Sequence, residues 1–342
     1  MSTRLRLGAA TASAALLLAG CGGDAQPGAL GDGTGQVDYW LWDANQLPAY
    51  QQCARDFEAA NPDITVRITQ LGWDDYWSRL TTSMVAGTAP DVFTDHLSRY
   101  SVYVNADQLL PLDDFIAEDG VDTDIYQPGL ADLWVGQDGK RYGLPKDWDT
   151  IAIFYNKEMV AEAGLSEDDL AAMDWNPQDG GSYEDVIARL TVDENGVRGD
   201  EPGFDKDNVA VYGLGLEGNV GGGIGQTQWS MYTGANGWTA TDTNPWGEHY
   251  RYDEPAFHET IAWWRSLIEK GYMPPLEVAS AGIGLPDAFA AGRAAMNTNG
   301  AWMIGQYYGY DGIDVGLAPT PIGPTGSRAS MYNGLSDAIY AG

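Results

Sequence analysis

The sequence has few cysteines, few basic residues and no long apolar run beyond its first residues. Only two cysteines, Cys21 and Cys53, occur in 342 residues, so disulfide bonds cannot form the framework of the fold. Lysine and arginine together number 18 against 49 acidic residues, a formal net charge of −31. So acidic a surface repels nucleic acid, which excludes a nucleic-acid partner. Past the N-terminal segment no stretch approaches the length of a membrane span.

Metal-binding motifs are also absent from the sequence. The three histidines, His96, His249 and His258, show no metal-ligand spacing, and there is no CxxC motif. The acidic region 193–208 offers oxygen ligands of the kind that Ca²⁺ prefers, but it lacks the Gly and Glu order of the established calcium loop. We therefore favour a solvated hairpin there, with a structural calcium site as the alternative, and expect no cofactor.

The N-terminal residues have the features of an export signal. A basic start and a short apolar stretch lead to Leu18-Ala19-Gly20-Cys21. This motif resembles a bacterial lipobox, in which the cysteine receives a diacylglycerol and becomes the first residue, and two acyl chains suffice for stable anchoring. We expect a signal peptide over 1–20, a lipid-modified Cys21 and a flexible Gly-rich tether over 21–36. The protein would then work outside the cytoplasm, anchored to the cell membrane.

Strands and helices are predicted to alternate from residue 37 onward. Apolar runs and helix stop signals predict strands at 37–42, 64–68 and 91–94, with helices at 48–60 and 74–85 between them. This order is typical of a parallel sheet with crossover helices. The first helix is expected to bury Cys53 on its inner face. Later segments predict strands at 150–155, 294–298, 314–318 and 336–342, and helices at 157–164, 183–190, 254–270, 285–291 and 301–308.

The sequence is rich in Trp and Tyr relative to Phe, with 13 Trp and 19 Tyr against 7 Phe. Trp and Tyr combine a flat apolar face with a hydrogen-bonding edge. Carbohydrate is a ligand of matching character, with apolar C–H faces and a rim of hydroxyl groups. The composition favours a sugar ligand modestly, since many of these rings also serve as core.

Several stretches in the same order resemble one family, the extracellular solute-binding proteins of ATP-driven sugar importers, typified by maltose-binding protein. The resemblance runs from about Val37 to Gly342. It is carried by Phe57–Val66, Met84–Phe93, Gly143–Lys157, Ala288–Met296 and Asn299–Trp302.

The resemblance implies an α/β fold of two lobes with a central ligand cleft and hinge crossovers, the type II periplasmic-binding-protein-like fold. Lobe 1 would hold 37–146 and 329–342, and lobe 2 would hold 147–328. Family members usually continue for many tens of residues, so the resemblance also implies that lobe 1 is truncated at its C-terminus. The implied function is the substrate-binding component of an ABC transporter. It would be a monomer without enzymatic activity that delivers a mono- or oligosaccharide, or a polyol, to a membrane permease.

Candidate binding residues come from two arguments. Ligands of open α/β sheets bind outside the carboxyl ends of the strands, which selects Trp42, Asp43, Asn45, Asp95, His96, Trp148 and Asp149. The resemblance implies a ligand-binding carboxylate at Asp149 and a sugar-stacking ring at Trp302, and it adds Trp229, Tyr232, Tyr332 and Asn333. Core packing is the alternative for each tryptophan.

Two other classes of function remain open. Carboxylates near tryptophans also occur in glycoside hydrolases, so a secreted, lipid-anchored hydrolase is the alternative, although no pair of acids is singled out by its spacing. A lipid-anchored adhesin would show repeats or an all-β pattern, and the sequence shows neither.

Overall fold

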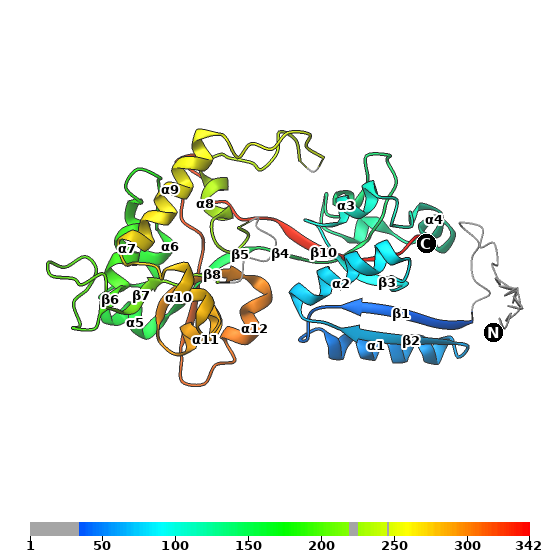
Figure 1. Cartoon of the computed structure of the whole chain (residues 1–342), viewed down its shortest axis with the longest axis horizontal. Coiled ribbons are helices and arrows are strands. Elements are labelled where there is room, and N and C mark those ends of the chain that lie inside the picture. The colour runs from blue at the N-terminus through cyan, green and yellow to red at the C-terminus, as the bar shows by residue number, and fades with distance from the viewer. Residues whose placement is uncertain (1–33, 219–224, 245) are drawn as a thin grey trace, which may run out of the picture.

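The computed structural model describes residues 34–218, 225–244 and 246–342. Two lobes lie side by side, joined by extended segments at the middle of the molecule (Figure 1). Cys21, the signal segment and most of the expected tether fall outside the described residues. Within the described part, no helix is long and apolar enough to cross a membrane.

The first lobe is built on a five-stranded sheet of order β2-β1-β3-β10-β4. Its first three strands are parallel, whereas β10 runs antiparallel to both β3 and β4. The strands are β1 (Gly35–Leu41), β2 (Ile64–Gln70), β3 (Val92–His96), β4 (Pro145–Asp149) and β10 (Asn333–Ile339). The helices are α1 (Leu47–Ala60), α2 (Trp73–Ala86), α3 (Tyr100–Asn105) and α4 (Asp113–Asp119), with 3₁₀ turns at Thr123–Ile125 and Ala131–Trp134.

Helix α2 supplies much of the core of the first lobe. Tyr76, Leu80 and Met84 recur every four residues, so they share one helix face, and all three are buried. They belong to one apolar cluster with Phe93 of β3. Gly87 ends the helix in the left-handed conformation at φ 67°, which glycine adopts without steric cost.

Helix α1 differs from its sequence expectation. None of its residues is buried, and Cys53 is exposed rather than packed on an inner face. The helix lies along the sheet through partly buried side chains such as Tyr50, whose ring stacks on Tyr39 of β1 at 5.5 Å. Cys53 is not among the partly buried positions through which α1 meets the sheet.

The second lobe is built on a sheet of order β6-β7-β8-β5-β9. Its strands are β5 (Ile151–Asn156), β6 (Val192–Asp193), β7 (Val209–Leu214), β8 (Ala294–Gly300) and β9 (Val315–Ala318). Its helices are α5 (Lys157–Glu162), α6 (Glu167–Ala171), α7 (Gly181–Leu190), α8 (Ser230–Ala235), α9 (Pro255–Glu269), α10 (Leu276–Ala281), α11 (Leu285–Ala290) and α12 (Ile304–Tyr307), preceded by the 3₁₀ turn η3 (Ala301–Met303).

Aromatic rings dominate the core of the second lobe. Tyr183 of α7, Tyr232 of α8 and Trp263 of α9 meet Trp175 in one buried cluster, with ring centroids 5.0–6.2 Å apart. The Tyr183 and Tyr232 hydroxyls share a hydrogen bond of 2.8 Å, which satisfies both polar ends away from water. Many of the tryptophans and tyrosines that suggested sugar are therefore core residues.

Two segments cross between the lobes. One is the step from β4 to β5 at Thr150, and the other leads through Ser330 into β10. The two segments touch, because Ser330 Oγ accepts the backbone N–H of Ile151 at 2.7 Å and lies 2.5 Å from Thr150 Oγ1. The predicted two-lobed α/β fold with hinge crossovers is confirmed.

Candidate functional site

A cavity of about 510 Å³ lies between the lobes beside the crossovers. Its wall includes Ser98 and Tyr100 from the first lobe, Trp229 and Ser230 from the second, and Tyr332 from the second crossover. Aromatic side chains line it from both sides: Tyr100, Trp229, Trp238, Trp246, Tyr252 and Tyr332. Its size falls within the range of about 300–1,000 Å³ that is typical of small-molecule sites.

A carboxylate and an amide are paired where the two crossovers meet. Asn333 Nδ2 donates to Asp149 Oδ2 at 2.9 Å, and Asn333 also lines the cavity. Asp149 Oδ1 is buried and has no hydrogen-bond partner in the structure. Burial raises the pKa of Asp149 to about 7, although the Asn333 hydrogen bond acts in the opposite direction. Asp149 itself does not line the cavity, so its unused acceptor lies behind Asn333, which does. A buried acceptor without a partner is costly, which favours a ligand donor that could reach it.

Two exposed rings lie next to this pair. Trp148 and Tyr332 stack with ring centroids 5.8 Å apart and planes 24° apart, and they are 44% and 45% exposed. Antiparallel pairing of β4 with β10 brings them together, since Trp148 lies opposite Gly334. Such flat, wettable faces suit the C–H side of a sugar ring.

Trp302 lies on the second lobe, close to the first crossover. It follows β8 in the turn η3, and the Ala301 N–H donates to the Thr150 carbonyl at 3.0 Å. The indole is 41% exposed and lies over Gly300, where any Cβ would collide with the ring. The neighbouring helix α12 is on the side of the second lobe that faces the first (Figure 1).

The residues that follow β1 are near the cleft but do not line this cavity. The carboxyl end of β1 points toward the second lobe (Figure 1). Trp42 packs against Trp73 and Trp77, with ring centroids 5.0 and 5.2 Å away. Asp43 Oδ1 accepts the N–H of Asn45 at 2.8 Å, a turn that caps the strand end.

Three of the predicted ligand contacts, Asp95, His96 and Tyr232, are buried in this structure. Asp95 is 0% exposed, and burial raises its carboxyl pKa to about 8. Burial lowers the pKa of His96 to about 3, and its Nδ1 accepts the Ser98 N–H at 3.1 Å. Tyr232 belongs to the aromatic core described above. The carboxyl-end rule selected Asp95 and His96, and the resemblance added Tyr232; all three side chains are buried within the lobes.

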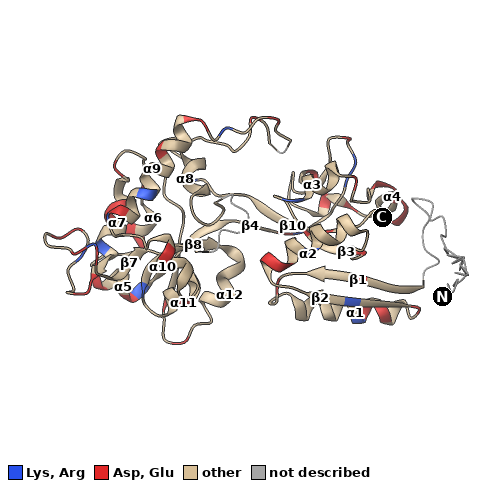
Figure 2. Ribbon diagram, viewed as in Figure 1, with Lys and Arg blue, Asp and Glu red and all other residues tan. Residues whose placement is uncertain are grey.

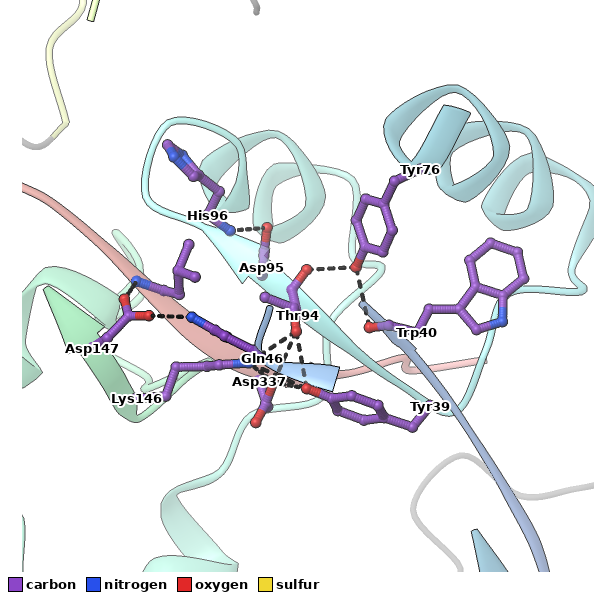
Figure 3. A network of polar contacts seen from close by, with 11 residues as sticks. Tyr39, Trp40, Gln46, Tyr76, Thr94, Asp95, His96, Lys146, Asp147 and Asp337 are labelled. Atoms are coloured by element: carbon purple, nitrogen blue, oxygen red, sulfur yellow. Dashed lines mark hydrogen bonds and ion pairs between the residues drawn. The ribbon is translucent and has the colours of Figure 1, made fainter. Parts of the chain in front are cut away.

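A partly buried lysine that the sequence analysis missed links β4 to the other strands of the first sheet (Figure 3). Lys146 Nζ lies 2.9 Å from Asp337 Oδ1 and from Thr94 Oγ1, and 4.2 Å from the Tyr50 ring centroid. Burial lowers its pKa, and the Asp337 charge opposes that shift. Because β3, β4 and β10 all contribute to the cluster, we assign it to holding the crossover in place.

The acidic region 193–208 forms a turn stabilised by Asp193. Asp193 Oδ1 accepts the N–H groups of Asn195 and Val197 at 2.8 and 2.9 Å, and Oδ2 accepts that of Asp205. Over the described ranges, no group of three or more His, Cys, Asp or Glu residues is placed to hold a metal ion.

Four aromatic residues of the cavity wall were not predicted: Tyr100, Trp238, Trp246 and Tyr252. A signal for three of them was present, since residues 238–252 carry Trp238, Trp246, Tyr250 and Tyr252 among Gly, Thr and Asn. An aromatic-rich segment with the composition of a loop was a signal for binding residues, although Trp238 is also buried against Trp229 and Phe257.

Relatives and solved structures match over most of the chain. A putative binding protein of Brucella abortus is 23% identical over 303 residues, which are 87% of this chain and 65% of the relative. The maltotriose-binding protein of Pyrococcus abyssi is 26% identical over 84% of this chain and 54% of its own length. This chain thus spans less than two thirds of the length of these relatives.

The structure of UspC from M. tuberculosis is 25% identical, with a TM-score of 0.66 over 90% of this chain and 73% of that one. An ABC substrate-binding protein from Listeria monocytogenes, in complex with cycloalternan, has a TM-score of 0.73 at 19% identity over 90% of this chain and 71% of that one. A family model described as bacterial extracellular solute-binding protein matches residues 52–341. The chain therefore belongs to the bacterial extracellular solute-binding protein family.

Proposed function

We propose that this protein captures a neutral mono- or oligosaccharide, or a polyol, between its lobes and hands it to the permease of an ABC importer. The observation that carries the proposal is the inter-lobe cavity with aromatic walls and the unpartnered Asp149 oxygen beside it. A carboxylate oxygen accepts a sugar hydroxyl, while the rings cover apolar C–H faces. Acidic residues are spread over both lobes (Figure 2), which argues against an anionic ligand.

The names of the relatives support this ligand class. Curated relatives are named for arabinooligosaccharide, maltotriose and maltodextrin, and similar structures hold tagatose and mannitol. These ligands share polyhydroxylated carbon skeletons and differ in length and linkage. We therefore propose the class and not one sugar.

Binding would close the two lobes around the ligand. A ligand drives closure only if it contacts the closed state better than the open one, so it must meet groups of both lobes. We propose 37–146 with 329–342, and 147–328, as the units that move, with the boundary shifted to Thr150 because 147–149 pair with β10 in the first sheet. Asp149 and Trp302 would contribute most to affinity, and Trp42 and Asp43 would contact the ligand from the facing lobe once the lobes close.

Location and partners follow from the same proposal. The protein would be a monomer that works outside the cytoplasm, with a diacylglycerol on Cys21 and a flexible tether holding it at the membrane. Mass spectrometry of the native amino terminus tests the anchor. A lipid-modified cysteine is the expected result, and membrane retention that is unchanged in Cys21→Ala would contradict it.

Thermal-shift screening tests the ligand class. A compound that binds only the folded state raises the melting temperature by mass action. The panel consists of hexoses, polyols and the malto-, arabino- and chito-oligosaccharide series, with amino acids and dipeptides as controls. We expect a shift from at least one saccharide or polyol and none from the controls; a shift from the controls alone would reject the proposal. An assay for new reducing ends in the same mixtures should stay negative, because we propose binding without hydrolysis.

A further inference from the structure

A hairpin of the second lobe extends across to the first. We call residues 239–244 and 246–251 the arm; it lies between α8 and α9 and reaches toward α3 (Figure 1). Its base is well braced, because Trp238 Nε1 donates to the Arg251 carbonyl at 2.8 Å and Arg251 pairs with Glu254 at 2.7 Å. Its two segments are joined by the isolated bridge between Thr241 and Tyr250. The described residues of the arm are therefore tied together at and above its base.

Trp246 fixes the tip of the arm against the first lobe. Its Nε1 donates to the Val135 carbonyl at 3.0 Å, and its ring lies edge-on to Tyr100 with centroids 5.6 Å apart. The Tyr100 hydroxyl donates to the same carbonyl at 3.3 Å. Two donors from opposite lobes thus converge on one acceptor, and Tyr100 is held in turn by Trp134 at 5.0 Å.

This contact forms part of the cavity wall. Trp246 and Tyr100 line the cavity together, as do Trp238 at the base of the arm and Leu133 of the first lobe. The arm therefore runs along the cavity from one lobe to the other. Because the Trp246 N–H is already used by Val135, the indole contributes apolar ring atoms and no free donor to the cavity wall.

We propose that the arm is a length selector, in which Trp246 closes one end of the cavity and restricts the site to short saccharides. This proposal rests on the proposed function. A short chain fits in the half-open cavity of about 510 Å³ and gains contact with the indole. A longer chain must displace Trp246, which breaks the hydrogen bond to Val135 and the contact with Tyr100.

The test compares the trimer and the hexamer of whichever series gives the largest melting shift: maltotriose and maltohexaose, or the arabino- or chito-oligosaccharides of the same lengths. Affinities are measured by titration calorimetry for wild type, Trp246→Ala and Tyr250→Ala. Tyr250 is the matched control, since it lies on the same arm, is 77% exposed and does not line the cavity.

The wild type and the control should bind the trimer at least tenfold more tightly than the hexamer, and Trp246→Ala should reduce this ratio to threefold or less. Trp246→Phe, which keeps a ring, should hold an intermediate ratio, and its melting temperature reports folding. A ratio unchanged in Trp246→Ala, or a wild type that binds both lengths equally, would overturn the length selector and leave sugar capture standing. A wild type that binds no saccharide would overturn both.

Discussion

Asn333 and Asp149 are 184 positions apart in the sequence, yet their side chains are hydrogen-bonded at 2.9 Å. Residue 149 ends the first crossover strand and residue 333 begins the second. Any change in the angle between the lobes acts on these two segments, because they are the covalent links. A ligand that engages the free oxygen of Asp149 would therefore bind at the hinge itself.

Sugar affinity should depend on pH through Asp149. Its pKa is about 7, so the ionised form, which is the stronger acceptor, predominates only above that value. We expect the association constant to rise several-fold between pH 5.5 and 8 and then to level off. Titration calorimetry across this range measures the effect, and Asp149→Asn should bind more weakly with a flat profile. An identical pH dependence in Asp149→Asn would assign it to another group.

Trp302 and Tyr232 should respond in opposite ways to truncation. The exposed Trp302 indole is a proposed stacking residue, so Trp302→Ala should weaken binding by about 2 kcal/mol, roughly thirtyfold, with little change in melting temperature. Tyr232→Ala should instead destabilise the fold by about 3–5 kcal/mol, because it removes a buried ring. Thermal melts and titrations of both variants decide the matter; an unfolded Trp302→Ala would identify Trp302 as a core residue.

The Lys146 cluster should be a source of stability for the first lobe. Lys146→Met leaves the Asp337 carboxylate and the Tyr39 and Thr94 hydroxyls without their common partner, so we expect a loss of about 2 kcal/mol in the free energy of unfolding. Lys140→Met is the matched control, since Lys140 is exposed and 4.0 Å from Asp138, and it should change stability by less than about 0.5 kcal/mol. Chemical denaturation monitored by fluorescence gives both values. Equal losses would show that the cluster has no special role.

The buried Asp95 should make the free energy of unfolding decrease as the pH rises. Its folded pKa is about 8 against 3.8 in the unfolded chain, so the unfolded state releases this proton first. The stability that the neutral Asp95 carboxyl contributes is fully present below about pH 4. It is lost progressively as the pH rises to about 8. Asp95→Asn, which cannot ionise, should therefore gain melting temperature relative to wild type between pH 5 and pH 9. A difference between the two proteins that does not change with pH would contradict this assignment.

Local sequence patterns predicted most helices and strands. Tyr76, Leu80 and Met84 mark the inner face of α2, and the expected strand at 294–298 corresponds to β8 at 294–300. These predictions succeed because hydrophobic periodicity is local. The site depends on contacts between distant segments, such as Asp149 with Asn333 and Trp246 with Val135, which no local pattern encodes. Asp95 shows a second limit, because a polar residue at a strand end can point into the lobe as well as toward the ligand.

The central claim is that this protein binds a saccharide or polyol without converting it. Titration calorimetry tests this claim most directly, using the compound that most raises the melting temperature. The account predicts saturable binding with one ligand per chain, a negative heat-capacity change from burial of the aromatic walls, and no turnover of the ligand. Heats indistinguishable from dilution for every saccharide and polyol in the panel, or ligand consumed during the titration, would contradict it.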